Sequence, residues 1–162
     1  MKGLIVIGYQ GIGKSTLAGW CNCIDLESSN FYVDGQRNES WYKTYCNIAL
    51  NIANQGFVVF TSSHKEVRDY FYQFLNNLPH NVGNIVIFCP QTLQKKDWID
   101  RLQERYDKTK SEKDKRALLN ATEKYEENIY DLTHCGFVYY QPKSINYNLK
   151  NYIEKMREQW CN

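Results

Sequence analysis

The sequence lacks long apolar runs and a charge of one dominant sign, and each absence excludes a class of protein. No stretch approaches the ~20 apolar residues of a membrane-spanning helix. Glycines and a lysine interrupt the N-terminus where a signal peptide has its apolar core. Twenty Lys and Arg oppose 18 Asp and Glu, for a formal net charge of +2. Because this balance is nearly even, we expect neither a membrane partner nor a nucleic-acid partner.

Paired cysteines are also lacking, although six cysteines are present. No C-x-x-C pair occurs, and Cys21-x-Cys23 has no second pair or nearby histidine that would complete a zinc site. Cys89 and Cys135 lie in apolar runs, where small buried residues are common. We therefore expect reduced, structural thiols in a cytoplasmic protein.

What the 162 residues do contain is an alternation of apolar runs with helical patterns. The runs typical of buried strands are 4-LIVIG-8, 23-CIDL-26, 57-FVVF-60, 85-IVIF-88 and 136-GFVYY-140. Strands separated by helices predict an α/β fold, in which helices cover both faces of a parallel sheet. Because no internal repeat or linker divides the chain, residues 1–162 are predicted to form a single domain.

Helical spacing occupies the segments between these runs. It is present after the glycine-rich segment as far as Trp20, over 41–54, from Val67 to Phe74, from Leu93 to about Leu132, and from Leu149 to Trp160. Ser63 and Glu66 predict a capping box for the third of these helices. The segment 108–115 is a weak interior of the fourth, and 28–40 is predicted to be a polar loop with a turn at Asp34-Gly35.

A glycine-rich segment, 8-GYQGIGKST-16, comes directly after the first predicted strand. It matches the P-loop pattern G-x-x-x-x-G-K-[ST], whose backbone N–H groups form a concave nest for phosphate oxygens. Its glycines permit close approach of the backbone to an anion, and the helix that follows points its positive end at the same place. Lys14 can bridge the β- and γ-phosphates, and the Ser15 hydroxyl can ligate Mg²⁺. The predicted nucleotide-binding residues are Gly8, Gly11, Ile12, Gly13, Lys14, Ser15 and Thr16.

With its third glycine the motif becomes G-x-x-G-x-G-K-S-T. In this form it resembles the small-molecule kinase branch of P-loop proteins, which includes nucleoside monophosphate kinases and shikimate kinase. It looks most like the small, divergent nucleotide kinases of phages and bacteria, which would place it in the cytoplasm of a bacterial host if a phage encodes it. The resemblance implies a three-layer fold with a five-stranded parallel sheet in the order 2-3-1-4-5. It also implies a helical lid at about 93–132, and ATP with Mg²⁺ as cofactors.

The same resemblance implies roles for particular residues. The second strand of these kinases ends in an acidic pair, and 25-DLE-27 occupies that place. Asp25 would therefore support the metal together with Ser15, and Glu27 would contact the acceptor. These kinases also close an arginine-rich lid over the phosphates. Arg101 and Arg105 are i and i+4, so a helix would present both on one face. The predicted catalytic residues are Lys14, Asp25, Arg101 and Arg105.

The acceptor is expected between the C-terminal ends of the first strands and the helices that follow them. Arg37 and Arg68 matter most, because an acceptor that carries its own phosphate needs fixed positive charge. Tyr32 and Trp41 could stack on a base. The candidate acceptor-binding residues are Glu27, Ser28, Ser29, Asn30, Arg37, Ser62, Ser63, His64 and Arg68.

The leading prediction is transfer of the γ-phosphoryl group of ATP to a small acceptor, in first place a (deoxy)nucleoside monophosphate. Two alternatives stay open. One is a kinase of a hydroxyl group on a modified DNA base or another metabolite, and the other is a nucleotide-binding regulator that hydrolyses its nucleotide slowly. The sequence does not decide between ATP and GTP, and it leaves a homodimer open.

Overall fold

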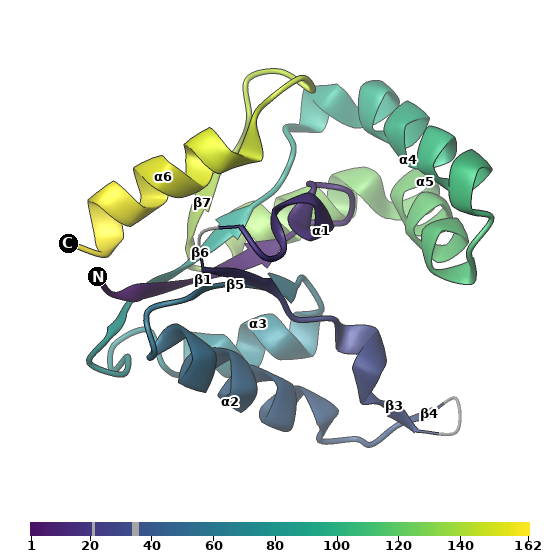
Figure 1. Cartoon of the computed structure of the whole chain (residues 1–162). Coiled ribbons are helices and arrows are strands. Elements are labelled where there is room, and N and C mark those ends of the chain that lie inside the picture. The colour runs from purple at the N-terminus through teal and green to yellow at the C-terminus, as the bar shows by residue number, and fades with distance from the viewer. Residues whose placement is uncertain (21, 34–35) are drawn as a thin grey trace.

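A five-stranded sheet forms the centre of the molecule, in a computed structural model that describes residues 1–20, 22–33 and 36–162 (Figure 1). Its strands are β1 (Gly3–Gly8), β2 (Cys23–Asp25), β5 (Val58–Ser62), β6 (Val82–Phe88) and β7 (Val138–Tyr140). They pair in the order β2-β5-β1-β6-β7, and every pairing is parallel. Counted without the separate β3–β4 hairpin, this is the predicted order 2-3-1-4-5, so the predicted fold class is confirmed.

The central strand β1 explains why the sheet is stable. All six of its residues are buried, and Leu4, Ile5, Val6 and Ile7 have no exposed surface. A parallel strand covered by helices on both faces must be apolar throughout, because neither face meets water. Burying each such aliphatic side chain stabilises the fold by roughly 1.5–3 kcal/mol.

The described residues form six α-helices around and beside the sheet: α1 (Lys14–Leu17), α2 (Trp41–Ala53), α3 (Lys65–Tyr72), α4 (Lys95–Thr109), α5 (Glu112–His134) and α6 (Leu149–Trp160). Figure 1 shows α2 and α3 on one side of the sheet, and α1 and α6 on the other. Helices α4 and α5 lie side by side as a hairpin that extends beyond the sheet. No helix within the described residues is both long and apolar enough to cross a membrane.

The weak interior predicted at 108–115 is the turn between α4 and α5. Lys110 adopts a left-handed conformation with φ of 51°, which ends α4. Ser111 then caps α5, because its hydroxyl oxygen accepts a hydrogen bond from the Asp114 backbone N–H at 3.1 Å. Such a cap stabilises a helix start by about 0.5–2 kcal/mol. The region predicted as one charged helical stretch is therefore a helical hairpin.

Several other boundaries differ from the sequence predictions. Helix α1 ends at Leu17, three residues before Trp20, because Ala18 leaves the helical conformation with ψ of 126°. The capping box at Ser63 and Glu66 is wrong: the N-cap of α3 is His64, and its side chain makes no capping bond.

The region from 28 to 40 is also more ordered than the predicted polar loop. It contains a short 3₁₀ helix, η1 (Ser28–Phe31), and a hairpin of β3 (Tyr32–Val33) and β4 (Gln36–Arg37). The turn predicted at Asp34-Gly35 and the residue Cys21 lie outside the described residues.

Candidate active site

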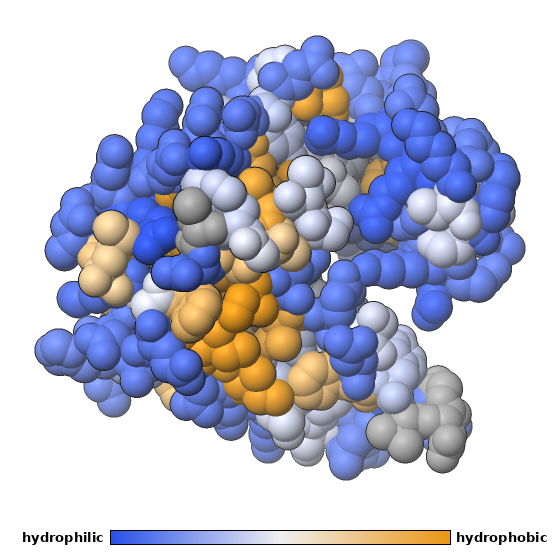
Figure 2. All heavy atoms as spheres, viewed as in Figure 1, coloured by the Kyte–Doolittle hydropathy of each residue, from blue (hydrophilic) through white to orange (hydrophobic). Residues whose placement is uncertain are grey.

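A cavity of about 840 Å³ opens where β1, β2 and β5 end. Figure 2 shows the surface hollowed between the α4–α5 hairpin and the β3–β4 hairpin. The cavity is lined by the glycine-rich loop, the segment that follows β2, the start of α3 and one face of α5. Ligands of α/β proteins bind at this edge of the sheet, beyond the carboxyl ends of the strands.

The glycine-rich loop has the backbone that the sequence predicts. Gly11 and Gly13 have φ of +83° and +97°, in the left-handed region that favours glycine. A Cβ on Gly8 would approach the Ile12 side chain to 2.5 Å, and a Cβ on Gly11 would approach Leu102 of α4 to 2.9 Å. Backbone conformation therefore favours glycine at positions 11 and 13, and Gly8 and Gly11 also lie close to neighbouring side chains.

The short length of α1 changes the source of anion attraction in this loop. Four residues make little more than one helical turn, and the N-cap residue, Gly13, has no side chain that could cap it. Few aligned peptide dipoles stand behind the loop, so the macrodipole contributes little. An anion at this place would be stabilised mainly by the loop N–H groups and by the Lys14 ammonium.

Lys14 follows the last glycine of the loop and lines the cavity. Its Nζ donates to the backbone oxygens of Gly8 at 3.3 Å and Thr61 at 3.5 Å, and no carboxylate within the described residues lies at ion-pair distance. Burial lowers the pKa of Lys14, whereas the negative charges of Asp25 and Glu27 act in the opposite direction. A cation with only neutral acceptors in such a place is poised to bind an anion.

Asp25 ends β2 and lines the same cavity as Ser15. Burial raises the pKa of Asp25, and the nearby Lys14 charge offsets part of that shift. No group of three or more His, Cys, Asp or Glu side chains in the described part of the chain could hold a metal alone. A hydroxyl and one carboxylate fit Mg²⁺ that arrives with nucleotide phosphates and retains several waters, as Mg²⁺ usually does.

Arg37 stands on the opposite side of the cavity between two aromatic rings. Its guanidinium carbon lies 4.3 Å from the Tyr32 ring centroid and 4.1 Å from that of Trp41. It donates to the Ser28 hydroxyl at 3.2 Å and to Nε2 of His64 at 3.3 Å. Because arginine can only donate, Nε2 must accept, and the His64 proton lies on Nδ1, 3.0 Å from the Ser62 hydroxyl.

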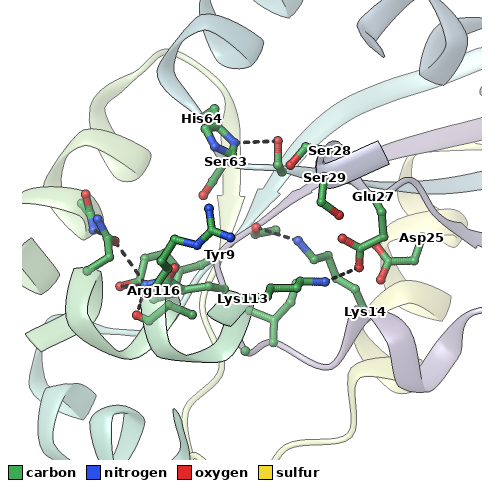
Figure 3. Close-up of a pocket in the computed structure, with 18 of the residues that line it drawn as sticks. Tyr9, Lys14, Asp25, Glu27, Ser28, Ser29, Ser63, His64, Lys113 and Arg116 are labelled. Atoms are coloured by element: carbon green, nitrogen blue, oxygen red, sulfur yellow. Dashed lines mark hydrogen bonds and ion pairs between the residues drawn. The ribbon is translucent and has the colours of Figure 1, made fainter. Parts of the chain in front are cut away.

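Figure 3 shows how the side chains meet. Lys14 and Arg116 approach one space from different elements, with His64 and Ser63 at its opposite side. Lys113 extends from α5 to Glu27, and its Nζ lies 2.6 Å from Glu27 Oε1. The predicted acceptor residue Glu27 is therefore already paired with a cation from the helical hairpin.

The two predicted lid arginines have different surroundings. Arg105 lines the cavity, and its Nε lies 2.7 Å from Asp114 of α5. Arg101 does not line it; its guanidinium instead lies 5.1 Å from the Trp98 ring centroid and 5.4 Å from that of Tyr147. The i and i+4 spacing predicted that both arginines would face the phosphates, but only Arg105 lines the cavity.

The structure gathers most of the other predicted site residues around one cavity. Those that line it are Gly8, Gly11, Ile12, Gly13, Lys14, Ser15, Asp25, Glu27, Ser28, Ser29, Tyr32, Arg37, Ser62, Ser63, His64, Arg68 and Arg105. Thr16, Asn30 and Trp41 do not, and Trp41 is instead buried against Phe31 and Tyr45. Arg68 is 9% exposed and donates to the backbone oxygens of Ser63 and Asp131.

Sequence reasoning missed the face of α5 that lines the cavity. Its residues are Lys113, Asp114, Arg116, Ala117, Asn120, Asn128, Asp131 and Leu132. The first of these recur at a spacing of three to four, as one face of a helix does. That spacing is a signal present in the sequence, but nothing there shows that this face meets the P-loop instead of solvent. Gln10 of the P-loop contacts this face of α5, since its Nε2 donates to Ala117 O at 2.9 Å and Asn120 Oδ1 at 3.2 Å.

Comparisons with known proteins give a fold and no family. No family model matches this chain, and no curated protein sequence matches it. Among solved structures, the tunicamycin resistance protein of Deinococcus radiodurans is similar, with a TM-score of 0.53 at 12% sequence identity. The match covers 98% of this chain and 95% of that one. At this identity the likeness shows a shared fold over nearly all of the chain, and it does not show a shared activity.

Proposed function

We propose that this protein transfers the γ-phosphoryl group of ATP to a small acceptor that is itself anionic, in first place a (deoxy)nucleoside monophosphate. The observation that carries the proposal is a set of cations around the P-loop cavity that lack acidic partners. Within the described residues, Lys14, Arg37, Arg68 and Arg116 line the cavity with no carboxylate at ion-pair distance. Lys14, Arg37 and Arg68 are at least partly buried, and uncompensated charge in such a place is costly unless a ligand of opposite charge occupies it.

Two of the acidic side chains that line the cavity strengthen this argument. Glu27 is paired with Lys113, and Asp114 with Arg105, so neither neutralises the four cations named above. One of these cations, Lys14, belongs to the loop for the donor phosphates. Arg37 lies among Ser28, Ser62 and His64, away from the loop, and suits a second anionic group. Two separate anion sites in one cavity fit a nucleoside triphosphate and a phosphorylated acceptor.

The proposed step is an in-line displacement at the γ-phosphorus. An acceptor phosphate oxygen forms the new P–O bond, and the bond to the bridging β,γ-oxygen breaks, so that ADP leaves with the electron pair. The loop amides and Lys14 bind the non-bridging oxygens. Arg105 of α4 and Arg116 of α5 neutralise further charge. Bound Mg²⁺, next to Ser15 and Asp25, would supply further charge neutralisation on the phosphates. A phosphate acceptor is already deprotonated at neutral pH and needs no strong base.

A second candidate is a kinase of a hydroxyl group, and one observation favours it. Asp25 lies near Lys14 at the end of β2 with a raised pKa, which suits a carboxylate that removes a proton from an acceptor hydroxyl. The third candidate, a regulator with slow hydrolysis, has no acceptor and would not need a second anion site at Arg37. The two kinase candidates differ in their acceptors and are separated by product analysis.

The experiment is incubation with Mg·ATP and a panel of nucleoside monophosphates and nucleosides. We expect ADP to form together with the diphosphate of at least one monophosphate. A product formed from nucleosides alone would favour the hydroxyl kinase. ADP formed at the same slow rate with and without any acceptor would favour the regulator and refute the proposal.

A further inference from the structure

The carbonyl groups of the P-loop are bound from outside the cavity by two aromatic side chains. Trp98 of α4 donates from Nε1 to Gln10 O at 2.9 Å, and Tyr147, before α6, donates from Oη to Ile12 O at 2.7 Å. Trp98 is fully buried. Neither ring lines the cavity, so both carbonyls point away from it.

Because the peptide unit is planar, these hydrogen bonds also fix the direction of the N–H groups that form the anion nest. In a trans peptide the C=O of one residue and the N–H of the next point in opposite directions. A hydrogen bond that holds Gln10 O outward therefore directs the Gly11 N–H inward, and the bond on Ile12 O does the same for the Gly13 N–H. These two glycines are also the residues of the loop with positive φ.

The two donors form one assembly with Arg101. The rings of Trp98 and Tyr147 are parallel within 3°, with centroids 6.3 Å apart, and the Arg101 guanidinium lies close to both. Burial raises the pKa of Tyr147 to about 12, although Arg101 lowers it in part, so the hydroxyl remains a donor at neutral pH. Leu102 of α4 also lies against the loop, since a Cβ on Gly11 would approach its Cδ2 to 2.9 Å.

We propose that Trp98 and Tyr147 are positioning residues that hold the P-loop in its anion-binding conformation before the nucleotide arrives, with Arg101 supporting both rings. This inference rests on the proposed function, because it assigns the loop amides to a triphosphate. It gives α4 a different task from a mobile lid, since α4 is fixed to the outer side of the loop. A nest whose donors are already aligned binds its anion without the cost of ordering them.

The test compares wild type with Tyr147→Phe and Trp98→Phe, in which an aromatic ring remains but the hydrogen-bond donor is lost. Trp160→Phe is the matched control. Trp160 of α6 also donates a hydrogen bond from Nε1, to the Tyr140 hydroxyl at 2.8 Å, but neither residue belongs to the loop or lines the cavity. The first readout is amide hydrogen exchange over residues 8–16 without any ligand. The second is the Kd for inorganic tripolyphosphate, with thermal unfolding measured alongside.

We expect faster exchange over 8–16 and a Kd raised about fivefold in each test variant, the equivalent of one net hydrogen bond. In turnover, KM for ATP should rise while KM for the acceptor stays unchanged. Trp160→Phe should lose comparable thermal stability and change neither readout. Wild-type exchange and affinity in both test variants would overturn the inference. If wild type bound no tripolyphosphate, the proposed function would fail, and the exchange data alone would still decide whether the two side chains hold the loop.

Discussion

Lys113 of α5 reaches across the cavity and pairs with Glu27, which follows β2, at 2.6 Å. The two side chains are 54% and 34% exposed, so the pair contributes about 0.2–1 kcal/mol. It joins the helical hairpin to the sheet at the place where ligands must enter. An interaction of this size can break and reform as a ligand binds.

Replacing Lys113 should weaken acceptor binding more than it weakens the fold. Lys113→Met leaves the Glu27 carboxylate without its cation, and this negative charge then opposes an anionic acceptor. We expect KM for the acceptor to rise by about threefold to tenfold, with little change in thermal stability. Lys115→Met is the control, because Lys115 is on the same helix, is exposed and does not line the cavity. An unchanged KM would mean that the pair has no part in acceptor binding.

Lys14→Ala should abolish most phosphoryl transfer while the protein stays folded. The variant removes the cation on the concave side of the loop, where negative charge develops in the transition state, and we expect turnover to fall by about 10²–10³. Circular dichroism would check the fold, and ADP formation would measure turnover. Lys96→Ala is the matched control, since Lys96 is an exposed lysine of α4 paired with Asp100 outside the cavity. Normal turnover in Lys14→Ala would contradict the role assigned to the loop.

Arg37→Lys should raise KM for the acceptor and leave KM for ATP unchanged. Lysine keeps the charge but loses the planar group that lies between Tyr32 and Trp41 and donates to both Ser28 and His64. Losing one or two such contacts should cost about tenfold in acceptor affinity. Steady-state kinetics with each substrate varied in turn would show the effect. If KM for ATP rose instead, Arg37 would belong to the donor site.

His64 should titrate below its ordinary pKa of 6.5. Partial removal from water lowers the pKa first, and the Arg37 guanidinium lowers it further. Between the lowered folded pKa and 6.5 the unfolded chain binds a proton before the folded one. The stability contribution of His64 is therefore complete above pH 6.5 and is lost as the pH falls through the folded pKa.

An NMR titration of the histidine rings tests this directly. In Arg37→Ala the pKa of His64 should rise part of the way toward 6.5, because burial remains. The stability of wild type should also fall more steeply than that of Arg37→Ala as the pH drops below 6.5. An unchanged pKa of His64 in Arg37→Ala would contradict the hydrogen bond between Arg37 and His64.

The sequence predicted the sheet well because each strand is a local signal. The apolar runs correspond to all five parallel strands, and the glycine-rich loop has the positive φ values that its glycines permit. Boundaries were less accurate where long-range pairing decides them. Strand β6 begins at Val82 instead of Ile85, because Gly3 and Leu4 of β1 extend the pairing to Val82 and Asn84.

The sequence predicted the part of the candidate site that lies on the loop and the strand ends, but not the part that α5 contributes. The loop, Asp25 and Arg37 come from motifs and strand ends, which sequence spacing locates. Lys113 and Arg116 reach the cavity, and Gln10 of the loop contacts α5, because α5 folds back from the turn at Lys110. No local pattern shows where a helical hairpin will lie. Arg101 illustrates the same limit, since its contacts with Trp98 and Tyr147 depend on a residue 46 positions away in the chain.

The most direct measurement follows the labelled γ-phosphoryl group of ATP in the presence of Mg²⁺ and each nucleoside monophosphate in turn. The account predicts that the label appears in a nucleoside diphosphate derived from the acceptor, in wild type and not in Lys14→Ala. Label recovered only as inorganic phosphate, whichever acceptor is present, would contradict it.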